Sequence, residues 1–344
     1  MRAFLNPALD QAAVPFPSNE AAVFHRRLRD YAPTPVHRLS HVADELGVAS
    51  VLVKDESNRL GLPAFKILGA SWAVELALRE QTETETLVAA SAGNHGRAVA
   101  HAAAQRGLAC RIYLPARSLA VRRGAIASEG AEVVVVEGTY EDAVQAAGRV
   151  ATEPGTALIA DVGESGPAEW VIDGYQTLFA EAAAEASYDL IVVPVGVGSL
   201  AAAAARHGAQ VGARVIGVEP VTAACLTASL AHSAPTPVPT PGTVMDGLDC
   251  AEISLAAWPT LHHGIAGTVA VTDDEAKVAM RELAAAGLAI GASGAAPLAG
   301  LRTLQTDQRC ADLRTQLQVG RRTSALLIAT EGMTDPPTAT TSVT

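Results

Sequence analysis

The feature that most constrains the fold of this chain is a repeated alternation of short apolar runs with longer alanine-rich segments. The runs TLVAAS (86–91) and DLIVVPVGVG (189–198) are apolar almost throughout, which predicts strands buried on both faces of a sheet. The segments GRAVAHAAAQRG (96–107) and SLAAAAARHG (199–208) predict helices, and Gly107 ends the first of them. Strands and helices that alternate in this way predict an α/β fold of open parallel sheets covered by helices.

Ligands of open parallel sheets bind beyond the carboxyl ends of the strands, at the glycine turns that begin the helices. Three segments of the chain have this position, namely SAGNHG (91–96), GVGSL (196–200) and TEG (330–332). They are distant in sequence, but the predicted fold allows them to converge in one crevice. We therefore expect a ligand site built from all three.

Composition argues against several classes of function. The formal net charge of −11 leaves no basic surface to neutralise phosphates, so we expect no nucleic-acid partner. No run reaches the ~18 apolar residues of a membrane helix, and the N-terminus does not resemble a secretion signal. The four cysteines form no CxxC pair, which argues against a disulfide framework or a zinc site. We expect a cytoplasmic protein without a bound metal, although Asp246 and Asp249 could be ligands as easily as loop caps.

Lys66 is the strongest candidate for a reactive residue. It follows a loop with glycine and proline and begins an apolar helix in RLGLPAFKILGAS (59–71). Partial desolvation and the positive end of the helix dipole would both favour the neutral amine, the form that attacks an aldehyde. The alternative is a surface lysine at a helix end. Lys54 in VLVKDES (51–57) looks similar, and we interpret it as structural.

The turn GVGSL offers a place for a phosphate group. Small residues let the N–H groups of Gly196, Val197, Gly198 and Ser199 approach a phosphate, and the dipole of the following helix adds to the attraction. The turn lacks the third glycine of a dinucleotide-binding motif and the GK[ST] of a P-loop. The alternative is a tight strand–helix turn that binds nothing.

The segment SAGNHG also precedes a helix. Ser91 supplies a hydroxyl, Asn94 an amide, and the turn at Gly93 exposed N–H groups, a set that could hold a carboxylate. His95 by itself is more typical of a helix-start or packing residue than of a catalytic base.

Together these motifs resemble those of the fold-type II pyridoxal-5′-phosphate (PLP) enzymes, the superfamily of tryptophan synthase β and serine/threonine dehydratase. The resemblance covers roughly residues 30–332. Within the superfamily, the chain is most similar to the diaminopropionate ammonia-lyase family. The similarity is carried, in the expected order, by RLGLPAFKILGAS, GNHGRAVA, YLPAR, GVGSLA, VIGVEP, TVMDGLDCAEISLAAWPTL and LLIATEGMTDP.

The resemblance implies a role for each candidate residue. Lys66 is similar to the lysine that holds PLP as a Schiff base, and residues 196–199 resemble the phosphate-binding turn. Asn94 resembles the residue that hydrogen-bonds the pyridine 3′-oxygen, and the Ser91–His95 loop resembles the substrate-carboxylate site. Thr330 resembles the partner of the pyridine nitrogen, where a hydroxyl does not stabilise a protonated ring and so favours elimination over transamination.

Asp161 aligns with an aspartate that acts in the family as a proton-abstracting base, and the alternative is an aspartate that caps a turn. The chain departs from the family pattern at two positions. Ala92 stands where a TDGNHG-type loop carries an acidic residue, so a second candidate base is missing and the loop looks like that of the dehydratases. Ala292 replaces the glutamate of a GESG pattern. These changes leave the cofactor assignment intact but allow a different β-substituted amino acid as substrate.

We therefore expect a lyase that catalyses α,β-elimination on a β-substituted amino acid such as 2,3-diaminopropionate, giving a 2-oxo acid and ammonia. Lys66 or Asp161 would remove the α-proton. The alternatives are a serine/threonine dehydratase, a β-replacement synthase, and a non-catalytic protein that binds PLP or an amino acid. A nicotinamide-dependent oxidoreductase fits the alternation of strands and helices but not the glycine pattern.

The resemblance also implies two lobes with the cofactor in the cleft between them. We expect an N-terminal arm (1–43) that joins the large lobe, large-lobe segments at 44–75 and 166–332, a smaller substrate-side lobe (76–165) and a frayed tail (333–344). Relatives of this fold are commonly homodimers, so we expect a homodimer with a small amino acid as its other partner.

Overall fold

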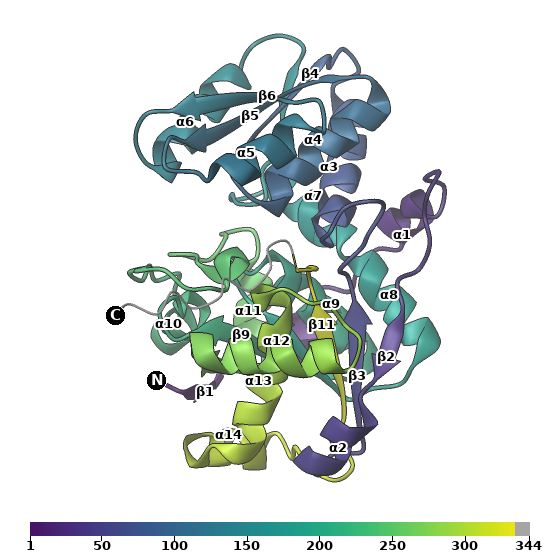
Figure 1. Cartoon of the computed structure of the whole chain (residues 1–344), viewed down its shortest axis with the longest axis vertical. Helices are drawn as coiled ribbons and strands as arrows, with labels where there is room; N and C mark the ends of the chain where they lie inside the picture. The colour runs from purple at the N-terminus through teal and green to yellow at the C-terminus, as the bar shows by residue number, and fades with distance from the viewer. Residues whose placement is uncertain (334–344) are drawn as a thin grey trace.

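Two β-sheets organise the structure, a computed structural model that describes residues 1–333 (Figure 1). The larger sheet has seven strands, of which the five central ones are parallel and the two edge strands are antiparallel to their neighbours. In spatial order they are β1 (Ala3–Leu5), β10 (Gly267–Val271), β9 (Arg214–Pro220), β8 (Leu190–Pro194), β11 (Ser324–Ala329), β3 (Ser50–Asp55) and β2 (Val36–Arg38).

The smaller sheet has four parallel strands, which come from one continuous part of the chain. In spatial order they are β6 (Glu132–Val136), β5 (Ala109–Pro115), β4 (Thr86–Ala90) and β7 (Thr156–Leu158). The prediction of two parallel, helix-covered sheets is confirmed. The strands are apolar because helices cover both faces of each sheet.

The alanine-rich segments form helices where the sequence predicts them, and Gly107 ends α4 in the left-handed conformation with φ +67°. No helix in residues 1–333 is both long enough and apolar enough to span a membrane. The α-helices are α1 (Glu20–His25), α2 (Ser40–Leu46), α3 (Lys66–Glu80), α4 (Asn94–Arg106), α5 (Ala120–Ala127), α6 (Tyr140–Val150), α7 (Pro167–Gly174), α8 (Gln176–Glu185), α9 (Ser199–Val211), α10 (Cys225–His232), α11 (Trp258–Gly264), α12 (Asp273–Ala285), α13 (Ala292–Thr306) and α14 (Ala311–Gln316).

One hydrophobic core connects the two sheets. Its buried side chains run from Leu87 and Ile112 in the smaller sheet to Ile191 and Val193 in the larger one. Helices α3 and α7 lie where the two sheets meet (Figure 1), and α3 packs against both α7 and α4. The first residue of α3 is Lys66, so the helix that carries the candidate reactive lysine begins at this junction.

The structure differs from the sequence prediction at two places. The weakly patterned N-terminal arm forms β1, which pairs with β10, and α1, because its partners lie far along the chain and leave no local pattern. The alanine-rich segment DGYQTLFAEAAAEA (173–186) predicts one helix, but the structure breaks it at Tyr175, between α7 and α8. The predicted frayed tail lies outside the described residues except for Met333.

Candidate active site

The three predicted ligand segments lie at the carboxyl ends of parallel strands, one in the smaller sheet and two in the larger sheet. In the smaller sheet β4 and β7 are paired, so the segments that follow Ala90 and Leu158 emerge at the same edge. In the larger sheet β11 pairs with both β8 and β3, so the turn after Pro194, the segment after Ala329 and the loop after Asp55 also emerge together. Parallel pairing therefore gathers segments that are distant in sequence.

Two hydrogen bonds join the edges of the two sheets. The Ser199 hydroxyl of the glycine turn donates to the backbone oxygen of Asp161, with 3.1 Å between the oxygens. The Asn94 side-chain nitrogen donates to Glu331 Oε2 over 2.9 Å. The candidate residues from both sheets thus form one connected site.

Lys66 and Asp161 face each other within this site. The Lys66 amine donates to Asp161 Oδ2 over 2.9 Å, and the two side chains are only 22% and 13% exposed. Burial acts to lower the pKa of the Lys66 amine, but the charges of Asp161 and Tyr175 and the hydrogen bond outweigh it, so the pKa lies above its ordinary value. The expected neutral amine is therefore wrong for the protein without its cofactor. The sequence could not show the carboxylate that keeps the amine charged.

Asp161 is held as a carboxylate. Burial opposes its ionisation, but His95 and Lys66 together keep its pKa well below the usual value for aspartate. His95 Nε2 donates to the backbone oxygen of Ile159 over 2.9 Å, and its Nδ1 lies 3.9 Å from Asp161 Oδ2 without a hydrogen-bond partner. Burial lowers the pKa of His95, which is 2% exposed. His95 therefore lies directly behind Asp161, and burial disfavours its protonated form.

The glycine turn between β8 and α9 has a shape that only small residues allow. Gly198 has φ +93°, and a Cβ there would lie 2.6 Å from Leu261 Cδ1. A Cβ at Gly196 would lie 2.6 Å from the backbone oxygen of Gly247. Among residues 1–333, no acceptor for the N–H groups of Gly196, Gly198 or Ser199 is found. These free donors at the N-terminus of a 13-residue helix suit an anion such as phosphate.

The loop between β4 and α4 supplies further polar groups. Ser91 Oγ accepts a hydrogen bond from the Gly93 N–H over 3.3 Å, and Asn94 is the first residue of α4. Ser91, Gly93 and Asn94 are each partly exposed, while His95 is buried. The first three residues are therefore accessible to a small ligand at a helix N-terminus.

Glu331 is a site residue that sequence reasoning missed, although it lies within the TEG segment. Its carboxylate accepts from Asn94, and burial raises its pKa. Thr330, next to it, is 4% exposed, and its backbone oxygen accepts from the N–H of Phe65. The signal in the sequence was position alone, because a glutamate directly after a buried strand end must lie at the same edge as Thr330.

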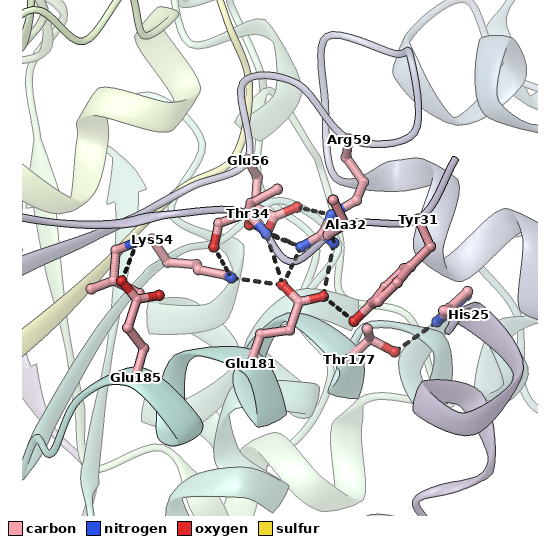
Figure 2. A network of polar contacts seen from close by, with 11 residues as sticks. His25, Tyr31, Ala32, Thr34, Lys54, Glu56, Arg59, Thr177, Glu181 and Glu185 are labelled. Carbon is pink, nitrogen blue, oxygen red and sulfur yellow. Dashed lines mark hydrogen bonds and ion pairs between the residues drawn. The ribbon is translucent and has the colours of Figure 1, made fainter. Parts of the chain in front are cut away.

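A buried ion network supports the loop that leads to Lys66 (Figure 2). Arg59 binds Glu56 through Nε and Nη2, and it binds Glu181 through Nη1 and Nη2, over distances of 2.6–2.8 Å. Lys54 donates to Glu181 over 2.7 Å and to the backbone oxygen of Thr34 over 2.6 Å. Two cations and two carboxylates balance in charge, so the network anchors the 56–65 loop to β3 and α8 without a net buried charge.

We expect Glu181→Gln to destabilise the protein by about 3 kcal/mol, because it leaves Lys54 and Arg59 with one carboxylate between them. Equilibrium unfolding in urea measures the loss. Glu185→Gln is the matched control, since Glu185 lies on the same helix but is exposed and accepts only one weak bond, from the Val36 N–H over 3.4 Å. Equal effects of the two substitutions would contradict the importance of the network.

The same substitution has a pH signature. Burial acts to raise the pKa of Glu181, but the bonds to Arg59 and Lys54 lower it from 4.5 to about 2. A depressed carboxyl pKa gives stability that is complete above pH 4.5 and is lost as pH falls from there toward 2. The stability difference between wild type and Glu181→Gln should therefore shrink over this pH range.

The residues present fit pyridoxal phosphate. The chain has three lysines, and only Lys66 lies at the junction of the sheets. Lys54 is buried in the ion network, and Lys277 lies on α12 beside Asp274. A phosphorylated aldehyde requires an amine to bond its aldehyde carbon and N–H donors to hold its phosphate. The site offers the Lys66 amine and the free N–H groups at the N-terminus of α9, with a partly buried carboxylate beside the amine. Within residues 1–333, no group of three or more His, Cys, Asp or Glu side chains is placed to hold a metal ion.

Comparisons with known proteins identify the family of the chain. The pyridoxal-phosphate dependent enzyme family matches residues 28–317. The chain is 34% identical to diaminopropionate ammonia-lyase of Salmonella typhimurium, over 92% of this chain and 89% of that protein. It is 32% identical to the Escherichia coli enzyme of the same name, over 92% and 88% of the two chains.

Solved structures agree as well. The crystal structure of Escherichia coli diaminopropionate ammonia lyase, in complex with an aminoacrylate–PLP azomethine reaction intermediate, matches with a TM-score of 0.88 and 30% identity. The match covers 97% of this chain and 94% of that one. A family match over most of the chain and a lysine amine at the junction of the two sheets lead to the same conclusion. The chain belongs to the pyridoxal-phosphate dependent enzymes, and its cofactor is pyridoxal 5′-phosphate.

Proposed function

We propose that this chain is an ammonia-lyase that converts 2,3-diaminopropionate and water into pyruvate and two molecules of ammonia by α,β-elimination. The observation that carries the proposal is the Lys66–Asp161 pair, 2.9 Å apart, at the edge where the glycine turn and the Ser91–His95 loop meet. The similarity to two diaminopropionate ammonia-lyases over 92% of the chain supports this substrate class.

The proposed roles follow from the geometry of the chain's own residues. Bound PLP supplies the electron sink that stabilises charge at the substrate's α carbon. Lys66 holds the cofactor at rest, and its freed amine is placed to take the α-proton. Asp161, as a carboxylate, stabilises the resulting ammonium or takes the proton itself. The rings of Phe65 and Tyr175, with centroids 5.6 and 5.9 Å from the Lys66 nitrogen, limit the access of water to the amine.

The remaining predicted site residues bind rather than react in this proposal. The turn from Gly196 to Ser199 would hold the phosphate, and Asn94, which donates to Glu331 here, would donate to the cofactor's 3′-oxygen. Ser91 and Gly93, with the α4 N-terminus, hold the substrate carboxylate. Thr330 would be the partner of the pyridine nitrogen.

A product assay with a panel of amino acids tests the proposed function. The purified, PLP-loaded protein is offered L- and D-2,3-diaminopropionate, serine and threonine, and both 2-oxo acid and ammonia are quantified. We expect two ammonia per pyruvate from 2,3-diaminopropionate, because the α and β nitrogens are both released. Failure to release pyruvate from either isomer would refute the proposed substrate.

A serine/threonine dehydratase is the second candidate, favoured by the SAGNHG loop with Ala92. The chain is also 31% identical to threonine dehydratase of Corynebacterium glutamicum, although only over 63% of its length and 50% of that protein. This reading predicts one ammonia per 2-oxo acid from serine or threonine. A β-replacement synthase would need an added nucleophile, and a binding protein would release no product from any amino acid.

We propose a homodimer in the cytoplasm as the working form. The assembly is inferred from relatives of the fold. The compartment is inferred from the four cysteines, which are all free thiols, three of them buried. Light scattering of the purified protein measures the oligomeric state.

A further inference from the structure

Tyr175 carries a hydroxyl that the fold buries without satisfying. Its side chain is 0% exposed, and the hydroxyl oxygen has no hydrogen-bond partner among the described residues. An unpaired buried hydroxyl costs free energy, and a phenylalanine of the same shape would avoid that cost. Because the hydroxyl costs stability at rest, we look for a function of this group in another state of the protein.

Close packing fixes where this ring lies. A Cβ at Gly69, one turn after Lys66 in α3, would lie 2.6 Å from Tyr175 Cε1 and 2.9 Å from Cζ. A Cβ at Gly174 would lie 2.5 Å from the backbone oxygen of Leu68. The two glycines let α3 and α7 touch through their backbones, so the hydroxyl-bearing end of the ring is held against the first turn of α3.

That position brings the hydroxyl near the Lys66 amine. The Lys66 nitrogen lies 5.9 Å from the centroid of the Tyr175 ring, and the Phe65 ring packs at a tilt against Tyr175 with 4.6 Å between centroids. Burial raises the pKa of Tyr175 to about 12, while the nearby Lys66 ammonium acts in the opposite direction. The two groups therefore interact at rest, although the hydroxyl makes no well-directed hydrogen bond to the amine.

We propose that Tyr175 is a positioning residue that holds the Lys66 amine during the reaction by accepting a hydrogen bond from it. An ammonium has three N–H groups, and at rest Asp161 accepts only one of them. With the Lys66 amine free and protonated, the Tyr175 oxygen would be its second acceptor, and two acceptors would fix the direction of the nitrogen. This inference rests on the proposed function, because it assigns Lys66 a proton-transfer role.

Tyr175→Phe tests the proposal, because it keeps the ring and removes only the hydroxyl. We expect kcat for the best substrate to fall about tenfold with little change in KM, since a hydrogen bond to a charged group is lost after substrate has bound. The melting temperature should stay the same or rise, because the lost hydroxyl had no partner at rest. If the Tyr175 hydroxyl had only a structural role, Tyr175→Phe would lower the melting temperature and would not lower kcat selectively relative to KM.

A second readout needs neither cofactor nor turnover. In the cofactor-free full chain, competitive acetylation measures the reactivity of Lys66, with the exposed Lys277 as an internal reference. Removing Tyr175's hydroxyl lowers the Lys66 pKa, so the neutral fraction and the relative acetylation rate should rise severalfold, in the direction opposite to kcat. An unchanged acetylation rate would overturn the proposal whatever the wild-type enzyme acts on, so its failure is distinct from that of the proposed function.

Tyr188→Phe is the matched control. Tyr188 lies in the loop between α8 and β8, and its partly buried hydroxyl is hydrogen-bonded to His207 Nε2 of α9 over 2.8 Å. This substitution should lower the melting temperature and leave both kcat and the acetylation of Lys66 at wild-type values. If Tyr175→Phe behaves in the same way as Tyr188→Phe, the Tyr175 hydroxyl has no role in positioning Lys66.

Discussion

A Lys66→Ala variant is expected to lose turnover by at least about 10³-fold and to lose the visible absorbance of the lysine-bound cofactor. The reason is that only one of the chain's three lysines lies at the junction of the two sheets, so no other amine can replace it. Absorbance spectra of the PLP-loaded protein and a pyruvate assay measure the two losses.

Two controls make this result specific. Lys277→Ala removes an exposed lysine on α12 and should leave colour and turnover unchanged. The melting temperature of Lys66→Ala without cofactor checks that the variant folds; it should fall below that of the wild type, because Asp161 loses its partner, but unfolding should remain cooperative. Retained colour and full activity in Lys66→Ala would refute the assignment of the cofactor lysine.

An Asp161→Asn variant is expected to lose about 10²–10³-fold in kcat while still taking up PLP. The amide keeps the shape of the carboxylate but neither accepts a proton nor balances the charge of the Lys66 amine. The pKa of Lys66 should therefore fall toward its ordinary value. Because the pKa of Asp161 itself lies far below neutrality, the wild type should show no acid limb from this group above about pH 4.

The pH profile of kcat and the affinity for PLP check this expectation. Asp44→Asn is a suitable control, since Asp44 lies exposed on α2, away from the carboxyl ends of the strands. If Asp161→Asn keeps the wild-type kcat, Lys66 alone removes the proton. Asp161 is then the structural residue of the alternative interpretation, an aspartate that caps a turn.

Figure 2 illustrates why part of the site was invisible in the sequence. Arg59 and Lys54 are ordinary basic residues in the sequence, and their shared carboxylate at Glu181 lies 122 and 127 residues away. No local pattern connects such residues, because a buried ion pair is specified by the packing of whole elements. The sequence supported only a structural interpretation of Lys54, without naming its partner.

Tyr175 shows the same limit in a different form. The segment 173–186 predicts one helix, but in the structure α7 ends at Gly174 and α8 begins at Gln176, with Tyr175 buried between them. The close contact of Gly174 with Leu68 places this break against α3. The burial and unpaired hydroxyl of that residue follow from the approach of α3 to α7. They could not be expected from the spacing of apolar residues.

The sequence by itself determined the α/β class, because the alternation of strands and helices repeats along the chain. It also determined the position of Lys66 at a helix start and the glycine turn at 196–199, because both are local features. Only the tertiary structure decided which groups surround the Lys66 amine. Asp161, 95 residues away, reaches it because β7 ends at the edge of the smaller sheet that meets α3, and its carboxylate makes the amine charged rather than neutral. The charge state of a side chain depends on its neighbours in space, and those neighbours are fixed by strand pairing and helix packing rather than by adjacent residues.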